Sequence, residues 1–244
     1  DTMTTDGAVT VTQGKLEGKA LTSLNFDGAN DHVVIPDAAD MSFGDGSTDT
    51  GNTFSAWINM DDATSFRVLH KGISATREYA FGTGTNDQLF LIMYDQVEHY
   101  IGQASATNSM TTYENQWIHI TGTYDGSEAA GGITLYVNGT PFTTTAATAG
   151  TYENGNIRDV RMFDFELSAD QVSSLYSGSY DVAPIHWWKF DDSTTSNSVT
   201  QAADTGSSSV GLYNGVLTNF GATNGSVSDT SNWNNGTLDL DSTL

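Results

Sequence analysis

Two short stretches of the chain carry closely spaced acidic residues that could bind a cation. "FDGANDH" contains Asp27 and Asp31, and "RDVRMFD" contains Asp159 and Asp164. Carboxylates are hard oxygen ligands, which together with backbone carbonyls suit Ca²⁺. Aspartates also cap turns, so the residues alone leave both a metal site and a turn-capping role open.

A third acidic stretch, residues 37–52, does not have the ligand pattern of a known calcium loop. It contains four aspartates. It lacks both the ligand spacing of an EF-hand and the terminal glutamate of that motif. We expect a solvated loop, with weak Ca²⁺ binding as the alternative.

The stretch "HWWKFDD", residues 186–192, places aromatic rings beside carboxylates. Such a combination is found in sugar-binding platforms and also in ordinary buried strands. Successive side chains of a strand point to opposite faces. Trp188 and Phe190 therefore share one face, which we expect to be buried, and Trp187 and Lys189 share the other.

Isolated tyrosines could also contribute to ligand binding. An exposed tyrosine can stack on a sugar, but packing at a strand end is the alternative that we favour for each one. No ligand-binding residue is assigned from the sequence. The candidates are Tyr94, Tyr100, Tyr113 and Tyr152.

The composition restricts the class of partner. The 244 residues include 30 acidic and 8 basic side chains, which gives a net charge of −22. Such a chain repels phosphate backbones and anionic membranes, so we expect no nucleic acid partner. It contains no cysteine and no apolar run near the roughly 20 residues that span a bilayer, so we expect no membrane insertion.

The elements that must position these residues are almost all strands. Alternating β-branched and aromatic runs are separated by Gly, Asn and Asp. In "TFSAWINM", Phe54, Ala56, Ile58 and Met60 face one way. Asn138-Gly139 predicts a type I′ hairpin turn. One helix is expected at 168–178, with Ser168 and Gln171 as a capping box. The remaining strands are expected at 23–28, 32–36, 66–72, 78–82, 88–94, 97–103, 116–125, 132–139, 140–145 and 156–164.

These strands occur in an order that resembles a known family. "ALTSLNFDGANDHVVIP", "TFSAWINM", "QWIHITGTYDG", "ITLYVNG" and "IRDVRMFDFELSADQVSSLY" look like the laminin-G-like, concanavalin A-like jelly-roll family, over about residues 20–178. The resemblance implies an all-β fold, a two-sheet antiparallel β-sandwich with one short C-terminal helix. The alternating strands also need a second sheet to bury their apolar face. We expect the strands that carry Trp57 and Trp117 in the core, together with Phe26, Leu135, Val137 and Val160.

The resemblance also bears on the acidic stretches. In that family the strands that carry them pass near each other, and a structural Ca²⁺ is often found there. The metal ligands expected here are Asp27, Asp31 and Asp159, of which Asp27 and Asp159 match the motif positions best.

No pattern supports catalysis. Glycosidases of the same broad sandwich class present carboxylates along one strand as Glu-x-Asp-x-(x)-Glu, and a retaining enzyme needs two carboxyls about 5 Å apart. The nearest stretch, "DFE" at 164–166, lacks that spacing, and the five histidines show no His-Glu-x-x-His pattern. His99 and His119 are interpreted as strand residues. We therefore expect no enzymatic activity.

Residues 179–244 look like the opening strands of a second module. "WWKFDD", "YNGVLTN" and "GTLDLDS" follow the order in which family members begin, and Leu24, Phe26 and Asp27 match Leu238, Leu240 and Asp241. This gives three parts: an N-terminal segment 1–19, the jelly roll 20–178 and the C-terminal segment. The segment could belong to a truncated second module, complete its own sandwich, or complete a neighbouring subunit.

The sequence favours a non-catalytic recognition or adhesion module. It would bind a glycan or protein and be displayed extracellularly, on a cell surface or on a virion. The alternative is a structural subunit of a capsid decoration, fibre or filament that binds copies of itself through residues 184–244. A glycoside hydrolase is a distant third.

Overall fold

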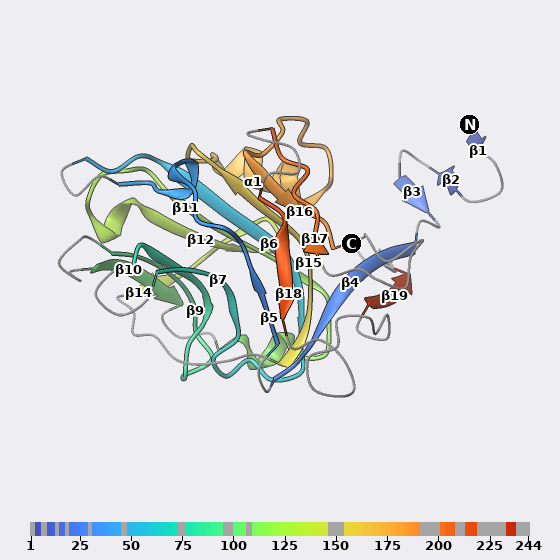
Figure 1. Ribbon diagram of the computed structural model, residues 1–244, viewed down its shortest axis with the longest axis horizontal. Helices are drawn as coiled ribbons and strands as arrows, with labels where there is room; N and C mark the ends of the chain where they lie inside the picture. Colours follow the sequence, from blue (N-terminus) through green and yellow to red (C-terminus); the bar gives the residue numbers. More distant parts are fainter. Residues whose placement is uncertain are drawn as a thin grey trace.

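A computed structural model shows a β-sandwich of two antiparallel sheets (Figure 1). The fold class expected from the sequence is confirmed. The structure describes residues 3–5, 9–12, 15–17, 20–28, 31–44, 48–72, 77–94, 100–105, 109–145, 154–190, 201–207, 213–218 and 233–237.

The larger sheet has eight strands. Seven follow the order β13-β12-β11-β6-β15-β4-β19, and β16 pairs with β15 beside this path. Its strands are β4 (Ala20–Asp27), β6 (Asn52–Met60), β11 (Ile118–Tyr124), β12 (Ile133–Val137), β13 (Thr140–Phe142), β15 (Asn154–Phe163), β16 (His186–Trp188) and β19 (Trp233–Thr237).

The facing sheet has five strands in the order β14-β10-β9-β8-β7. They are β7 (Arg67–Lys71), β8 (Tyr79–Thr83), β9 (Leu89–Tyr94), β10 (Tyr100–Ser105) and β14 (Thr144–Thr145). Two three-stranded sheets complete the set: β1 (Met3–Thr5), β2 (Val9–Thr12) and β3 (Lys15–Glu17), and β17 (Gln201–Ala202), β18 (Gly215–Thr218) and β5 (His32–Val34).

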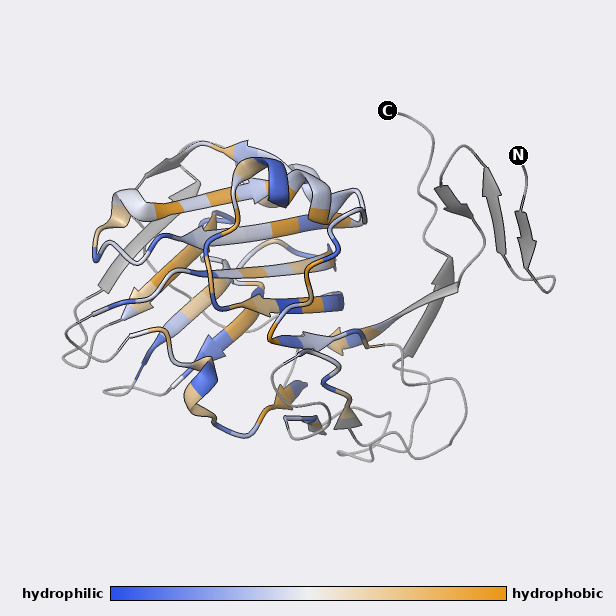
Figure 2. Ribbon diagram, turned by 90° about the horizontal axis from the view of Figure 1, so that it is seen from above, coloured by the Kyte–Doolittle hydropathy of each residue, from blue (hydrophilic) through white to orange (hydrophobic). Residues whose placement is uncertain are grey.

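The core lies between the two large sheets because the strands alternate as predicted. On β6, Phe54, Ala56, Ile58 and Met60 are all fully buried. The four core residues expected from the sequence, Phe26, Leu135, Val137 and Val160, are buried in the same cluster. Figure 2 shows the corresponding bands of apolar residues along the strands.

The predicted hairpin turn and helix are both present. Asn138 and Gly139 have φ of 50° and 73°, as a type I′ turn requires at both central positions. Helix α1 (Ala169–Tyr176) begins with the capping box of Ser168 and Gln171. Its apolar side packs on Tyr136 of β12 and Phe163 of β15, so α1 covers part of the outer face of the larger sheet (Figure 1). Three 3-10 turns, η1 (Ala39–Met41), η2 (Met110–Tyr113) and η3 (Ala130–Gly132), link strands. None of the described helices is long and apolar enough to cross a membrane.

The C-terminal segment pairs with strands of its own chain. β16 pairs with the second half of β15, while β4 pairs with the first half. β18 pairs with β5, and β19 pairs with β4. These pairings correspond to a segment that completes its own sandwich. Residues 238–241, on which the expected repeat depends, lie outside the described part, and the division at residues 19 and 178 stays a prediction.

Candidate functional site

A groove opens at one edge of the sandwich, between β5 and β7, and reaches the core. Its volume is about 990 Å³. The floor is apolar because it consists of core residues from both sheets, including Met41, Tyr79, Met162, Trp188 and Phe190. The groove therefore combines an apolar floor with a polar mouth, as small-ligand sites commonly do.

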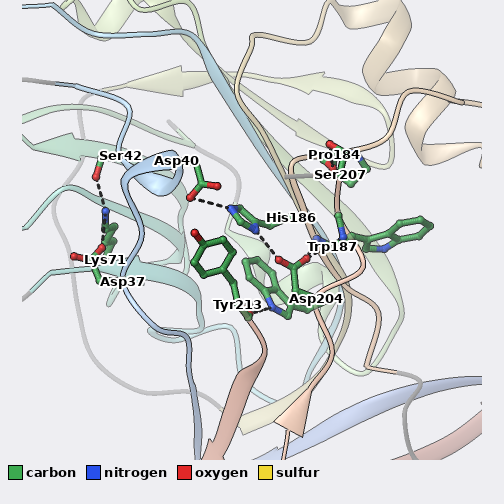
Figure 3. Close-up of polar contacts among 12 residues, drawn as sticks. Asp37, Asp40, Ser42, Lys71, Pro184, His186, Trp187, Asp204, Ser207 and Tyr213 are labelled. Atoms are coloured by element: carbon green, nitrogen blue, oxygen red, sulfur yellow. Dashed lines mark hydrogen bonds and ion pairs between the residues drawn. The ribbon is translucent and has the colours of Figure 1, made fainter. Parts of the chain in front are cut away.

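Lys71 of β7 links the two sides of the mouth. Its ammonium lies 3.1 Å from Asp37 Oδ1, on the segment that follows β5, and 3.0 Å from Glu78 Oε2. It also donates to Ser42 Oγ at 2.6 Å, and the contacts to Asp37 and Ser42 are drawn in Figure 3. The Lys71 side chain is only 13% exposed, whereas that of Asp37 is 82% exposed. Lys71 thus spans the mouth of the groove.

The wall beyond Lys71 carries two arginines and a histidine. Arg67, His70 and Arg77 line it together with Tyr94. The Arg77 guanidinium lies 5.7 Å from the centre of the Tyr94 ring. Burial lowers the pKa of His70, and the charges of Arg67 and Arg77 lower it further. Hence His70 stays neutral at pH 7, beside two permanent positive charges.

A buried histidine packs against Trp188, which lines the groove. The His186 Nδ1 lies 2.7 Å from Asp204 Oδ2, and its Nε2 lies 3.6 Å from Asp40 Oδ1 on the other side (Figure 3). Its ring stacks on Trp188 at a centroid distance of 5.4 Å. Asp204 is completely enclosed, and so this group fixes the floor rather than exposing a reactive atom.

The stretch "HWWKFDD" is divided between the two faces, as alternation predicts. Trp188 and Phe190 are buried, at 1% and 5% exposure, whereas Trp187 and Lys189 are half-buried. The indole of Trp187 points away from His186 in Figure 3. Its Nε1 donates to Asp159, and the Arg161 guanidinium lies 4.4 Å from the ring centre.

The three expected metal ligands do not lie together. Asp27 pairs with Asn154 at one end of β15, and Asp159 is five residues further along, about 16 Å at the usual rise of a strand. The Asp159 carboxylate accepts bonds from Arg161 Nη2 at 2.8 Å and from Trp187. Asp31 lines the groove. The side chain of Asp27 is outside the described part.

Cations and an indole N–H around Asp159 do not fit a calcium ligand, since they repel or displace the ion. Among the described residues, no group of three or more acidic, histidine or cysteine side chains could hold a metal. Calcium binding elsewhere in the chain stays a prediction.

The tyrosine candidates have different positions. Tyr94 lines the groove, and Tyr113 packs edge-on against Phe142. The side chains of Tyr100 and Tyr152 lie outside the described part, as does His99. His119 is a buried strand residue whose ring contacts Trp57 and Tyr176, at centroid distances of 5.3 and 6.0 Å.

The acidic groups of the groove do not resemble a catalytic pair. Asp37 and Glu78 both form ion pairs with Lys71, so neither carboxylate is directed at a substrate in the groove. Burial and the nearby charge of Asp125 raise the pKa of Glu166, but Glu166 is an exposed residue of the loop before α1 and is not in the groove.

The sequence is matched by the model of the concanavalin A-like lectin/glucanase superfamily over residues 27–153. This match covers more than half of the chain, and the protein belongs to that superfamily. No curated protein has a sequence that matches it.

Several solved structures have a similar fold. A protein of Bacteroides ovatus ATCC 8483, named as a proposed carbohydrate-binding protein, has a TM-score of 0.51 at 16% identity; the match covers 82% of this chain and 58% of that one. A heptameric SAP-like pentraxin of Limulus polyphemus has a TM-score of 0.43 at 15% identity, and the match covers 64% of this chain and 82% of that one. The receptor-binding domain of botulinum neurotoxin type G has a TM-score of 0.41 at 12% identity, and the match covers 81% of this chain and 61% of that one. At 16% identity, the likeness to the Bacteroides ovatus protein shows the fold alone.

Sequence reasoning did not identify the groove. Its cations Arg67, Lys71 and Arg77 are three of only eight in the chain and fall within eleven consecutive positions. In a chain of net charge −22, this cluster of basic residues is the sequence feature from which the groove could have been predicted. The contribution of Asp204 could not be inferred, because it depends on a contact between residues eighteen apart.

Proposed function

We propose that this protein is a non-catalytic recognition module that binds a glycan through the groove between β5 and β7. The observation that carries this proposal is the groove itself. Its apolar floor is continuous with the core, and its mouth presents Arg77, His70 and Tyr94 on one side of Lys71. Aromatic rings stack on the apolar faces of sugars, and the cationic side chains donate hydrogen bonds to hydroxyl groups.

The superfamily includes both lectins and glucanases, so membership is compatible with either glycan binding or glycan hydrolysis. The ion pairs of Asp37 and Glu78 with Lys71 favour binding over hydrolysis. A module of this kind would act outside the cell, on a cell surface or on a virion, and its partner would be a glycan or a glycosylated protein surface.

The test is a glycan array with the purified protein, followed by titration of the best ligand. We expect Tyr94→Ala and Arg77→Gln to weaken binding at least tenfold. Lys189→Gln, which removes a cation from the opposite sheet, is the matched control and leaves binding to this ligand unchanged. If both groove variants bind like the wild type, the groove is not the site. Hydrolysis of a bound polysaccharide, abolished by Glu78→Gln, would instead identify an enzyme.

A second candidate function is a structural subunit that assembles through residues 184–244. The pairing of β16 with β15 favours it, because a three-residue strand fills the place beside β15 that β4 leaves open. The same contact made between neighbouring chains would be a strand exchange. Light scattering of the full chain and of a variant that lacks residues 184–244 tests it. A full chain that stays monomeric at all concentrations contradicts this candidate.

A further inference from the structure

The groove carries half-buried aliphatic side chains on both of its walls. Val33 of β5 and Ile35, which directly follows β5, line one wall. Val68 and Leu69 of β7 line the other. All four are partly exposed and pack against the main core cluster. They are therefore apolar surfaces that a ligand in the groove can contact, in front of the buried floor.

An irregularity of β7 places two consecutive aliphatic residues on one wall. Neighbouring residues of a regular strand point to opposite faces. The pairing of β7 with β8 shifts register between Arg67 and Leu69, as it does at a β-bulge. Val68 and Leu69 accordingly both pack against the core and both line the groove.

The opposite wall follows the ordinary alternation of a strand. Val33 and Ile35 line the groove, whereas Val34 between them is not part of the lining. Val34 instead lies opposite Val216 of β18, and these two side chains are 49% and 42% exposed. Val33 and Val34 are thus a matched pair of valines in one strand, of which only Val33 is at the groove.

The formal charge of the groove's lining is zero. The lining contains three acidic and three basic side chains: Asp31, Asp37, Glu78, Arg67, Lys71 and Arg77. The whole net charge of −22 therefore belongs to residues outside the lining. That excess repels an anionic ligand and attracts a cationic one to the entire surface rather than to the groove. The groove is consequently suited to an uncharged ligand.

We infer that the ligand of the groove is an uncharged glycoside with an apolar aglycone, an alkyl or aryl group attached to the sugar. This inference rests on the proposed function and narrows it. The sugar lies at the mouth, against Tyr94, and the aglycone lies between the walls formed by β5 and β7. Burial of the aglycone removes apolar surface of the ligand and of both walls from water, and this drives binding. The groove's volume of about 990 Å³ is at the upper end of the roughly 300–1,000 Å³ found for sites of drug-sized ligands.

The test compares the methyl and hexyl β-glycosides of glucose, galactose and mannose with hexyl β-glucuronide and with hexanol. Calorimetry on the full chain gives the affinity for each compound. Each methylene that leaves water strengthens binding by up to about fourfold. For the sugar that binds best, we therefore expect the hexyl glycoside to bind at least about tenfold more tightly than the methyl glycoside. Hexyl glucuronide, which adds a negative charge, should bind at least about tenfold more weakly than hexyl glucoside, and hexanol should bind more weakly than the best hexyl glycoside.

Variants of the walls locate the aglycone. Val33→Thr and Val68→Thr keep the shape of the side chain and add a hydroxyl to the apolar wall. Each should reduce the preference for hexyl over methyl glycoside at least threefold and leave the affinity for the methyl glycoside unchanged. Val34→Thr is the matched control and should keep the wild-type preference. Tyr94→Ala, at the mouth, should weaken binding of both glycosides equally. Thermal unfolding of each variant is measured alongside, and if one wall variant does not fold, the other carries the conclusion.

The inference is overturned if methyl and hexyl glycosides bind equally, if the glucuronide binds more tightly than every uncharged glycoside, or if both wall variants keep the wild-type preference. In each of these cases the proposed function stands as long as Tyr94→Ala weakens binding. Hexanol that binds as tightly as the hexyl glycosides contradicts the proposed function, and the inference with it. Absence of binding by every compound overturns the inference, and the glycan array then decides the proposed function alone.

Discussion

His186 and Asp204 form an enclosed pair that ties the C-terminal segment to itself and to the core. The Nδ1 and Oδ2 atoms are 2.7 Å apart, and neither side chain is exposed. The other carboxylate oxygen accepts the backbone N–H groups of Trp187 and Gly206, both at 2.9 Å. One carboxylate therefore fixes β16 and the loop that follows β17.

Asp204→Ala should be among the most destabilising single changes in the protein. It leaves the His186 Nδ1 and two backbone N–H groups without their acceptor, and removal of one partner from a buried pair costs about 3–5 kcal/mol. Urea unfolding at pH 7 measures the loss. Asp164→Ala, at an exposed position, is the control and should change the free energy of unfolding by less than about 0.5 kcal/mol. Equal effects of the two changes would contradict this account of the pair.

Loss of the capping box of α1 should destabilise the protein less than loss of the Asp204 carboxylate. The Ser168 hydroxyl accepts the Gln171 N–H at 3.3 Å, and the Gln171 side chain accepts the Ser168 N–H at 2.8 Å. Ser168→Ala should lower the free energy of unfolding by about 1 kcal/mol. Ser173→Ala, on the exposed side of the same helix, should raise it slightly, because Ala has the higher helix propensity. A loss of similar size for both would mean that the cap contributes nothing specific.

Burial of His119 predicts a dependence of stability on pH. Burial, together with the charges of Arg161 and Arg158, lowers the pKa of His119 to about 3. In the unfolded chain the pKa is about 6.5. Between these values the unfolded state binds a proton that the folded state does not, so the free energy of unfolding falls as pH falls, by up to about 1.4 kcal/mol per pH unit.

The measurement is unfolding between pH 5 and 6.5, above the range in which ordinary carboxyls titrate. The wild type should lose stability over this interval, and His119→Gln should lose less. An identical slope for the two proteins would show that His119 binds its proton equally in the folded and unfolded states.

The strands, the turn and the helix were predictable because each depends on neighbours in the sequence. Phe54, Ala56, Ile58 and Met60 reveal their buried face through a period of two, and Asn138-Gly139 specifies its turn locally. The alternation also assigned Trp188 to the core and Trp187 to the outer face. These features need no knowledge of distant residues.

Which residues share the outer face of the larger sheet was less predictable, because it depends on strand register. Arg158 and Arg161 are on one face only because of the bulge at Asp159, which no local sequence pattern predicts. Likewise, Asp27 and Asp159 were expected to share one metal because their strands pass near each other in the family that the sequence resembles. The register of β15 instead pairs Asp27 with Asn154. A shared sheet does not bring two residues together unless they are also opposite each other.

A change at Asp159 tests whether this residue has a structural role or is a metal ligand. Its carboxylate accepts from Arg161 and Trp187, so Asp159→Asn weakens both interactions and should lower the free energy of unfolding by about 1–3 kcal/mol. Because these partners belong to the protein, the loss should be the same in excess Ca²⁺ and in excess chelator. Thermal unfolding of both proteins in both buffers measures it.

The same experiment tests calcium binding by any part of the chain. A protein that binds Ca²⁺ only when folded is stabilised by it, so a calcium site would appear as a lower melting temperature of the wild type in chelator. If that shift occurs and Asp159→Asn retains it, the ion is bound away from Asp159, and Asp27 and Asp31 are the residues to change next. If the shift disappears in Asp159→Asn, Asp159 is a ligand after all, and its pairing with Arg161 gives way to the metal.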